Sequence, residues 1–246
     1  MKILVINSGS SSLKCSLFAM PDGGAAEGEA ARPVALANCT VERIGEGKSA
    51  IQIQTDGRSE ERPCRAADHA EALEAALEAL VEEGNGVLES LEEIAAVGHR
   101  VVHGGEKIAE TVAVDAEHPD ACEVIAAIKE NATLAPLHKQ PNLTGLQAAI
   151  RRLPGRLQVA VFDTAFHQSM PPQAYLYAVP YELYREHHVR RYGFHGTSHR
   201  YVAERAAQML QRPPAECNLI TIHLGNGCSA AAVRGGRSVD TTMGLT

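Results

Sequence analysis

The sequence lacks the features that mark exported, membrane-bound or nucleic-acid-binding proteins. Near the N-terminus only residues 3–6 form an unbroken apolar run, which is too short for a signal peptide, and no later stretch could span a membrane. The formal net charge is -7, and no basic run or basic patch interleaved with aromatics occurs. Nothing therefore favours general binding to nucleic acid or to an acidic membrane. We expect a cytoplasmic protein that binds neither.

Motifs for metal binding and for serine hydrolysis are also missing. The 6 cysteines contain no Cys-x-x-Cys pair and do not cluster with histidine, so we expect reduced side chains rather than disulfides or zinc ligands. His99 and His103 lie on an expected strand and turn with no third ligand nearby. No Gly-x-Ser-x-Gly motif occurs, and no helix follows the serines at 8–12, which argues against a Ser/His/Asp hydrolase.

What the chain does have is an N-terminal strand, a turn of small hydroxyl residues and a second strand, over residues 2–19. Gly9 lets backbone N–H groups approach an anion, and Ser10 and Ser12 add further donors. Lys14 supplies a compact positive charge, and Asn7 offers an oxygen to a cation. The pattern predicts a phosphate-binding hairpin; an ordinary serine-rich hairpin with a solvated lysine is the alternative.

Residues 219–233 repeat this pattern. An apolar strand leads into His223 and Leu224, a turn of Gly225, Asn226 and Gly227 follows, and a strand of small and apolar residues returns. The repeat suggests an internal duplication, although glycine-rich hairpins are common enough to align by chance.

The remaining pattern predicts an α/β protein with sheets covered by helices. Pro21–Gly24 indicates a turn, segments 34–44 and 49–55 extend an antiparallel meander, and residues 94–101 and 158–163 indicate buried strands. Helical spacing of apolar residues occurs at 68–81, 119–131 and 142–153. Asp68 and Glu71 resemble a capping box.

A further helix is expected after Ser198, which is a suitable N-cap residue. The helix would carry five apolar residues, and Pro213 and Pro214 would end it. The five are Tyr201, Val202, Ala206, Met209 and Leu210.

Polar residues stand at the ends of four expected strands: Asn7, Arg100, Asp163 and His223. Open α/β sheets commonly bind ligands at such ends. Arg100 can hold a carboxylate or phosphoryl group with a planar fork, and Asp163 could position or deprotonate an acceptor. His195 lies between two glycines, where the backbone can bring its imidazole close to a bound group. The set suits phosphoryl transfer, which needs alignment and positive charge; for each residue alone, a structural role is an equal alternative.

Five segments carry a resemblance to a known family: Val5–Lys14, Gly98–Gly105, Val161–Pro171, Tyr192–His199 and His223–Gly227. Together they resemble the acetate and propionate kinase family of the sugar-kinase, Hsp70 and actin superfamily, along the whole chain. The resemblance implies an α/β, ribonuclease-H-like fold of the actin/Hsp70 type with mixed sheets and flanking helices, duplicated, with an incomplete second copy. It divides the chain into an acetate- and phosphate-binding domain, 1–163, and the start of a nucleotide-binding domain, 164–246.

The implied reaction is reversible transfer of the γ-phosphoryl group of ATP to acetate, giving acetyl phosphate and ADP, with magnesium or, in its place, manganese. By this resemblance Asn7 lies at the metal site, and Arg100 at the acetate carboxylate. Asp163 is the catalytic carboxylate, and His195 stabilises the phosphoryl group in transfer. Nucleotide phosphates would contact Lys14, Ser10, Ser12 and the segment His223–Gly227.

The resemblance also implies an apolar pocket for the acetate methyl group, from Val102, Leu137 and Phe194, and a further active-site histidine, His138. Lys139 and Gln140 depart from the Asn-Pro that the family usually has after this histidine. Relatives continue past the motif at 241–246 to a second arginine, an adenosine pocket and a metal-binding glutamate. The chain would thus be truncated, able to bind phosphates without turnover.

Three alternatives stay open. A kinase for propionate or butyrate differs only by one or two methylenes in an apolar pocket. A non-catalytic nucleotide-binding module of the actin/Hsp70 type would bind ATP without forming an acyl phosphate. The chain alone could also serve as a folding or dimerisation unit, since family enzymes pair as homodimers through the second domain.

Overall fold

The computed structural model describes residues 1–21, 33–84, 86–117, 122–130 and 136–244. The chain forms two compact units, which we call the first and the second unit. The first comprises Met1–Arg100, Val112–Lys129 and Pro136–Ala160, and the second Val101–Thr111, Glu130–Ala135 and Val161–Thr246. The division into domains 1–163 and 164–246 stays a prediction. The turn expected at Pro21–Gly24 lies outside the described residues, except for Pro21.

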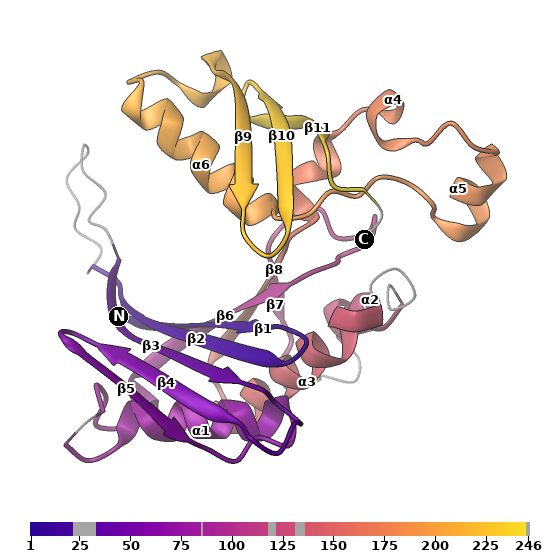
Figure 1. The fold of residues 1–246 in the computed structure, drawn as a ribbon. Coiled ribbons are helices and arrows are strands. Elements are labelled where there is room, and N and C mark those ends of the chain that lie inside the picture. Colours follow the sequence, from indigo (N-terminus) through magenta and orange to yellow (C-terminus); the bar gives the residue numbers. More distant parts are fainter. Residues whose placement is uncertain (22–32, 85, 118–121, 131–135, 245–246) are drawn as a thin grey trace. The chain divides into compact units, whose positions relative to one another are not determined.

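A mixed sheet of eight strands forms most of the first unit, in the order β5-β4-β3-β2-β1-β6-β8-β7 (Figure 1). Strand β1 pairs antiparallel with β2 and parallel with β6. The strands are β1 (Lys2–Ser8), β2 (Ser12–Ala19), β3 (Val34–Glu42), β4 (Ala50–Thr55), β5 (Arg58–Pro63), β6 (Ile94–Val101), β7 (Val112–Val114) and β8 (Leu157–Phe162). The predicted meander and buried strands are confirmed, whereas β5 and β7 were not expected.

Helix α1 (His69–Val81) packs against β2, β3 and β4 through its buried leucines. It begins where predicted, because the carboxylate of Asp68 accepts hydrogen bonds from the first-turn N–H groups, including that of Glu71. The predicted capping box is wrong in one detail: the Glu71 carboxylate accepts from the N–H of Ala67, not from that of Asp68. A short 3₁₀ turn, η1 (Leu91–Glu93), leads into β6.

Helices α2 (Glu123–Glu130) and α3 (Pro136–Arg152) complete the first unit. Helix α3 starts before the predicted position 142 and contains Pro141, a residue that local rules exclude from a helix interior. It packs against α1 and β1, and the Asn142 amide donates to the carbonyl of Ser8 at 2.8 Å. These tertiary contacts compensate for the hydrogen bond that the proline cannot donate.

The second unit contains a three-stranded antiparallel sheet in the order β11-β10-β9. Helix α6 packs against β9 and against the 3₁₀ turns η3 and η4, and two shorter helices, α4 and α5, lie between η3 and α6 in the chain (Figure 1). The elements are η3 (Ala165–Ser169), α4 (Pro172–Tyr175), α5 (Tyr181–His187), α6 (Gly196–Met209), η4 (Pro214–Glu216), β9 (Asn218–Leu224), β10 (Cys228–Arg234) and β11 (Arg237–Thr241).

Helix α6 corrects one sequence prediction. Its N-cap is His195, and Ser198 lies inside the first turn. Its buried face consists of Gly196, His199, Ala203 and Ala207, whereas most of its larger apolar residues are exposed, with Met209 at 80%. The small buried residues let the helix lie close to the sheet. No helix within the described ranges is long and apolar enough to cross a membrane.

Candidate active site

Lys14, Asn7 and Arg100 form a row across three neighbouring strands, here named the β1 row. In the strand register Asn7 on β1 is paired with Lys14 on β2 and with Arg100 on β6. Directly paired residues project from the same face of a sheet. Because Leu4 and Ile6 alternate with this position and are buried on the helix-covered side, the row lies on the partly exposed face. The guanidinium of Arg100 donates to Oδ1 of Asn7 at 3.1 Å.

The turn between β1 and β2 is held by its own hydrogen bond and by two further contacts that the sequence did not reveal. The hydrogen bond of the turn joins Gly9 N–H to the Ser12 carbonyl at 2.8 Å. Nε2 of His69, the first residue of α1, donates to the Gly9 carbonyl at 2.7 Å. The Asn142 amide secures Ser8 from the other side. Ser10 is exposed and Ser12 half-buried, so the turn presents hydroxyl groups while its backbone is anchored.

Asp163 follows β8 directly and lies at the start of α6. Its carbonyl accepts a hydrogen bond from Gly196 N–H at 2.9 Å, and its own N–H donates to the Val101 carbonyl at 3.0 Å. A Cβ atom at position 196 would lie 2.3 Å from that carbonyl oxygen, so only glycine permits this approach. The Asp163 side chain is buried. The structure therefore places the backbone of Asp163 against the start of α6, one residue after His195.

His195 and the second hairpin come together in the second unit. The backbone of His195 is left-handed, with φ of 57°, a conformation that is uncommon outside glycine. Its imidazole stacks on that of His223, with ring centres 4.1 Å apart and planes inclined by 22°. A Cβ atom at Gly227 would lie 3.1 Å from Nε2 of His195. Two predicted site segments thus meet, and the Ser198 hydroxyl contacts Nδ1 of His223 at 2.9 Å.

Four other histidines, His99, His103, His167 and His199, are buried, and burial lowers the pKa of each. Burial lowers the pKa of His99 to about 4, and Nε2 of His99 donates to Oε1 of Gln158 at 2.7 Å. Burial and the charge of Arg190 lower the pKa of His103 to about 4. Burial likewise lowers the pKa of His199 to about 4. Among the described residues, no group of three His, Cys, Asp or Glu side chains could hold a metal ion.

The basic stretch ahead of His195 carries matched charges. Arg190 is buried, donates to the Glu106 carboxylate at 2.6 Å, and lies with its guanidinium carbon 3.8 Å from the centre of the Tyr175 ring. Arg191 pairs with Asp240. These arginines therefore stabilise the second unit through ion pairs and a cation–π contact, and they are poor candidates for an anion site.

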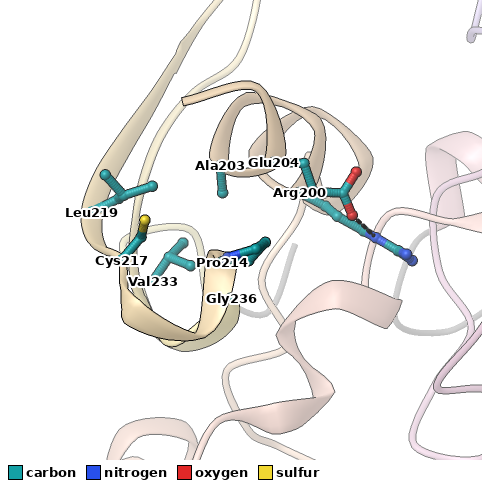
Figure 2. A pocket seen from close by; sticks show the side chains of 8 residues that line it. All are labelled: Arg200, Ala203, Glu204, Pro214, Cys217, Leu219, Val233 and Gly236. Atoms are coloured by element: carbon teal, nitrogen blue, oxygen red, sulfur yellow. Dashed lines mark hydrogen bonds and ion pairs between the residues drawn. The ribbon is translucent and has the colours of Figure 1, made fainter. Parts of the chain in front are cut away.

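Two hollows in the described part of the chain contain none of the candidate residues. Figure 2 shows the first, between α6 and the β9–β10 sheet, where Arg200 donates to Glu204 at 2.9 Å. Its volume is about 80 Å³. It is too small for a nucleotide, since ligand pockets occupy roughly 300–1,000 Å³. A larger hollow of about 690 Å³ follows β3 and the β4–β5 turn.

The other predicted residues are placed as follows. Phe194 is buried, Val102 is half-buried, and Leu224, Gly225 and Asn226 are exposed at the tip of the second hairpin. Leu137 and His138 belong to α3, but their side chains fall outside the described part of the structure. The candidate residues that the structure describes are thus divided between the two units.

The mixed sheet, its flanking helices and the two hairpins define an actin/Hsp70-like α/β fold, the class that the sequence predicted. Residues 2–246 match the Acetokinase family, and the chain belongs to that family.

Named relatives agree with this assignment. The chain is 51% identical over 247 residues to a protein named acetate kinase from Natranaerobius thermophilus, a match that covers 100% of this chain and 58% of the relative. Its structure is similar to that of Porphyromonas gingivalis acetate kinase, with 43% identity, a TM-score of 0.89, and coverage of 100% of this chain and 58% of the other. It is also similar to the structure of a propionate kinase from Francisella tularensis, with 38% identity and a TM-score of 0.85. That match covers 100% of this chain and 58% of the other. The chain therefore spans about 58% of the length of these relatives.

Proposed function

We propose that the protein carrying this chain is an acetate kinase, which transfers the γ-phosphoryl group of ATP reversibly to acetate. A carboxylate oxygen of acetate forms a bond to the γ-phosphorus while the bond from that phosphorus to the β,γ-bridging oxygen breaks. ADP leaves with the electron pair, and acetyl phosphate is the other product. The observation that carries the proposal is the β1 row, which aligns an arginine, an amide and a lysine on an open sheet face.

In the first unit, Arg100 would bind the acetate carboxylate through its guanidinium fork. Asn7 accepts from this guanidinium at 3.1 Å and so restricts its orientation. Lys14, together with Ser10 and Ser12, would contact the nucleotide phosphates as donors, because each lies on or beside the anchored turn. Binding and orientation are the tasks that this unit is proposed to perform.

Magnesium is compatible with the donors that the chain offers. Mg²⁺ prefers oxygen ligands and is often held by one or two protein groups, substrate phosphates and water. Oδ1 of Asn7 accepts one hydrogen bond from Arg100, and an amide oxygen has two lone pairs. Asn7 would therefore contribute one oxygen at the metal site, where magnesium, or manganese in its place, would offset the charge of the phosphates.

In the second unit, Asp163 would be the catalytic carboxylate and His195 would stabilise the planar phosphoryl group. A carboxylic acid substrate is already ionised at neutral pH, so Asp163 would orient the reacting groups rather than remove a proton from acetate. The segment His223–Gly227, which includes Leu224, Gly225 and Asn226, would contact ATP phosphates. Val102, Leu137 and Phe194 would surround the acetate methyl group, and His138 would complete the site.

Propionate is the second candidate acceptor, because a propionate kinase shares 38% identity and a TM-score of 0.85 with this chain. One methylene in an apolar pocket changes specificity by only about 1–3 kcal/mol, or roughly 10–200-fold. Butyrate would need still more room. We favour acetate because the relatives with 51% and 43% identity are named acetate kinases.

Trapping of the acyl phosphate by hydroxylamine tests the proposal on the whole protein. We expect hydroxamate to form with acetate, ATP and Mg²⁺, and not when a chelator removes the metal. A higher kcat/KM for propionate than for acetate would assign the second candidate. No hydroxamate with acetate, propionate or butyrate, combined with binding of ATP, would identify a non-catalytic nucleotide-binding module instead.

The organisation of the whole protein is part of the proposal. We propose domains 1–163 and 164–246 as an acetate- and phosphate-binding domain and the start of a nucleotide-binding domain. We also propose a cytoplasmic homodimer that associates with neither nucleic acid nor membrane. Light scattering of the whole protein measures the dimer directly, and a monomeric mass at micromolar concentration would contradict it.

A further inference from the structure

Four side chains form a hydrogen-bonded chain within the second unit, which we call the hydroxyl–imidazole chain. Nδ1 of His195 lies 2.9 Å from Oγ of Ser229 on β10. The same oxygen lies 2.8 Å from Nε2 of His199 on α6. Nδ1 of His199 in turn lies 2.8 Å from Oγ1 of Thr221 on β9. Ser229, His199 and Thr221 are all at most 3% exposed, so water does not compete for these contacts.

The direction of these hydrogen bonds follows from counting protons. Oγ1 of Thr221 also lies 3.5 Å from the Ala231 carbonyl, which can only accept; we assign the Thr221 proton to this contact, so that Oγ1 accepts from Nδ1–H of His199. Burial lowers the pKa of His199 to about 4, which keeps this imidazole neutral at neutral pH with one N–H only. Nε2 of His199 is therefore an acceptor, and the Ser229 hydroxyl must donate to it. The remaining hydrogen bond of Ser229 is then accepted from Nδ1–H of His195.

We propose that Ser229 is a positioning residue that fixes both the tautomer and the ring orientation of His195. Since Nδ1 keeps its proton in the neutral and in the protonated ring, Nε2 is the nitrogen that gains or loses a proton. A half-turn of the ring would replace Nδ1 by Cδ2 and break the hydrogen bond to Ser229. The stack on His223 limits tilting of the ring, and the hydrogen bond to Ser229 distinguishes its two edges.

The effect of Ser229 on catalysis rests on the role proposed for His195 in phosphoryl transfer. The protonation pattern of the hydroxyl–imidazole chain does not depend on that role. When His195 is protonated, Nε2–H becomes a donor to the phosphoryl oxygens, and the chain behind it needs no rearrangement. The reverse direction would require Ser229 and His199 to exchange protons before His195 could be charged. The assigned order of donors and acceptors therefore prepares Nε2 for an anionic group.

The test combines nitrogen NMR of ¹⁵N-histidine-labelled whole protein with kinetics. In the parent protein we expect neutral His195 to show a protonated Nδ1 and an unprotonated Nε2. Ser229→Ala should give a mixture of both tautomers and lower kcat about 10-fold, compared with about 100-fold for His195→Ala, with KM values changed less than about 2-fold. The matched control is Ser238→Ala, because Ser238 is equally buried and bonds Nδ1 of a different histidine, His167, at 2.8 Å.

Ser238→Ala should leave the His195 nitrogen signals unchanged and kcat within about 2-fold of the parent. Thr221→Val, which removes the hydroxyl at the far end without changing size, should mix the His195 tautomers with a smaller loss of kcat than Ser229→Ala. An Nε2–H tautomer in the parent, or unchanged His195 signals in Ser229→Ala, would overturn the proposal. Absence of acetyl phosphate from the parent would overturn the proposed function only, since the NMR result still decides the positioning role.

Discussion

The two hairpins of this chain share a sequence pattern but differ in what surrounds them. Hairpin β1–β2 lies inside an eight-stranded sheet, with β6 beside β1 and β3 beside β2. Hairpin β9–β10 belongs to a three-stranded sheet in the described part of the chain, and β9 forms its edge. In β1 the apolar residues Leu4 and Ile6 are buried, whereas in β9 Ile220, Ile222 and Leu224 are 71%, 61% and 79% exposed.

The difference shows that the strand pattern defines a hairpin without defining which face is covered. On β1 the covered face is apolar and the open face carries the β1 row. On β9 the covered face includes Thr221, which belongs to the hydroxyl–imidazole chain, and the open face is apolar. The first hairpin therefore rests on a hydrophobic core, and the second on a buried polar network that must be fully hydrogen-bonded to be stable.

The largest expected effects are on kcat for a substitution in the second unit and on KM for a substitution in the first. Asp163→Asn in the second unit should lower kcat about 100–1,000-fold, because a fixed charge at the reacting group is lost. Arg100→Ala in the first unit should raise KM for acetate about 10–100-fold, since one charge-assisted hydrogen-bonding partner contributes about 1.5–3 kcal/mol. Steady-state kinetics with acetate as the varied substrate measures both.

The control for Arg100 is Arg58→Ala, which removes an exposed arginine from β5. It should leave both parameters unchanged. If Arg100→Ala lowered kcat at constant KM, the division of binding and catalysis between the units would be wrong.

Substitutions of one isoleucine on β1 and one on β9 test whether the two strands differ in how their apolar side chains are buried. Ile6→Ala should lower the free energy of unfolding by about 3 kcal/mol, because Ile6 is 1% exposed and its loss leaves a cavity. Ile222→Ala should cost less than about 0.5 kcal/mol, as for other exposed positions. Urea unfolding followed by circular dichroism measures both values. An equally large cost at Ile222 would show that further polypeptide covers the open face of β9.

The sequence predicted most of the sheet because its strands alternate clearly. It missed β5, whose sequence Arg-Ser-Glu-Glu-Arg-Pro has no apolar alternation and becomes a strand by pairing with β4. It also placed the start of α3 at 142, because Pro141 is a local stop signal and the packing of α3 on β1 cannot be seen in a local pattern. Tertiary contacts decide both cases.

Within the candidate site, the sequence indicated Asn7, Arg100 and Asp163 by their place at strand ends, and His195 by the glycines around it. It did not identify Ser229 or His69, because an isolated buried serine or histidine carries no periodic or motif signal. Nor did it show that the buried face of α6 holds His199 and small residues, because the network behind His195 lies there.

A smaller effect is expected from pH at the strand beside the first hairpin. Burial lowers the pKa of His99 to about 4, against an ordinary value near 6.5, so the unfolded chain binds more protons between these values. Its contribution to stability is complete above about pH 6.5 and is lost as the pH falls to about 4. His99→Asn should therefore reduce the acid-induced loss of unfolding free energy by at most about 3 kcal/mol.

Unfolding midpoints measured at intervals between pH 7 and pH 4 give this difference in slope. The same substitution at His187, which is exposed on α5, is the control. An unchanged slope in His99→Asn would show that His99 is protonated in the folded protein.

The smallest expected effects compare the glycines of the two turns. A Cβ atom at Gly9 would lie 2.9 Å from Oγ of Ser12, a hydroxyl that can rotate away, so Gly9→Ala should change kcat less than about 2-fold. A Cβ atom at Gly227 would lie 3.0 Å from Cε1 of His195, whose ring is held by the stack on His223 and by Ser229. Displacing this ring by a few tenths of an ångström should lower kcat about 5-fold. Equal kcat values for the two variants would mean that the ring of His195 tolerates displacement, and the second hairpin would then act only as a phosphate-binding turn like the first.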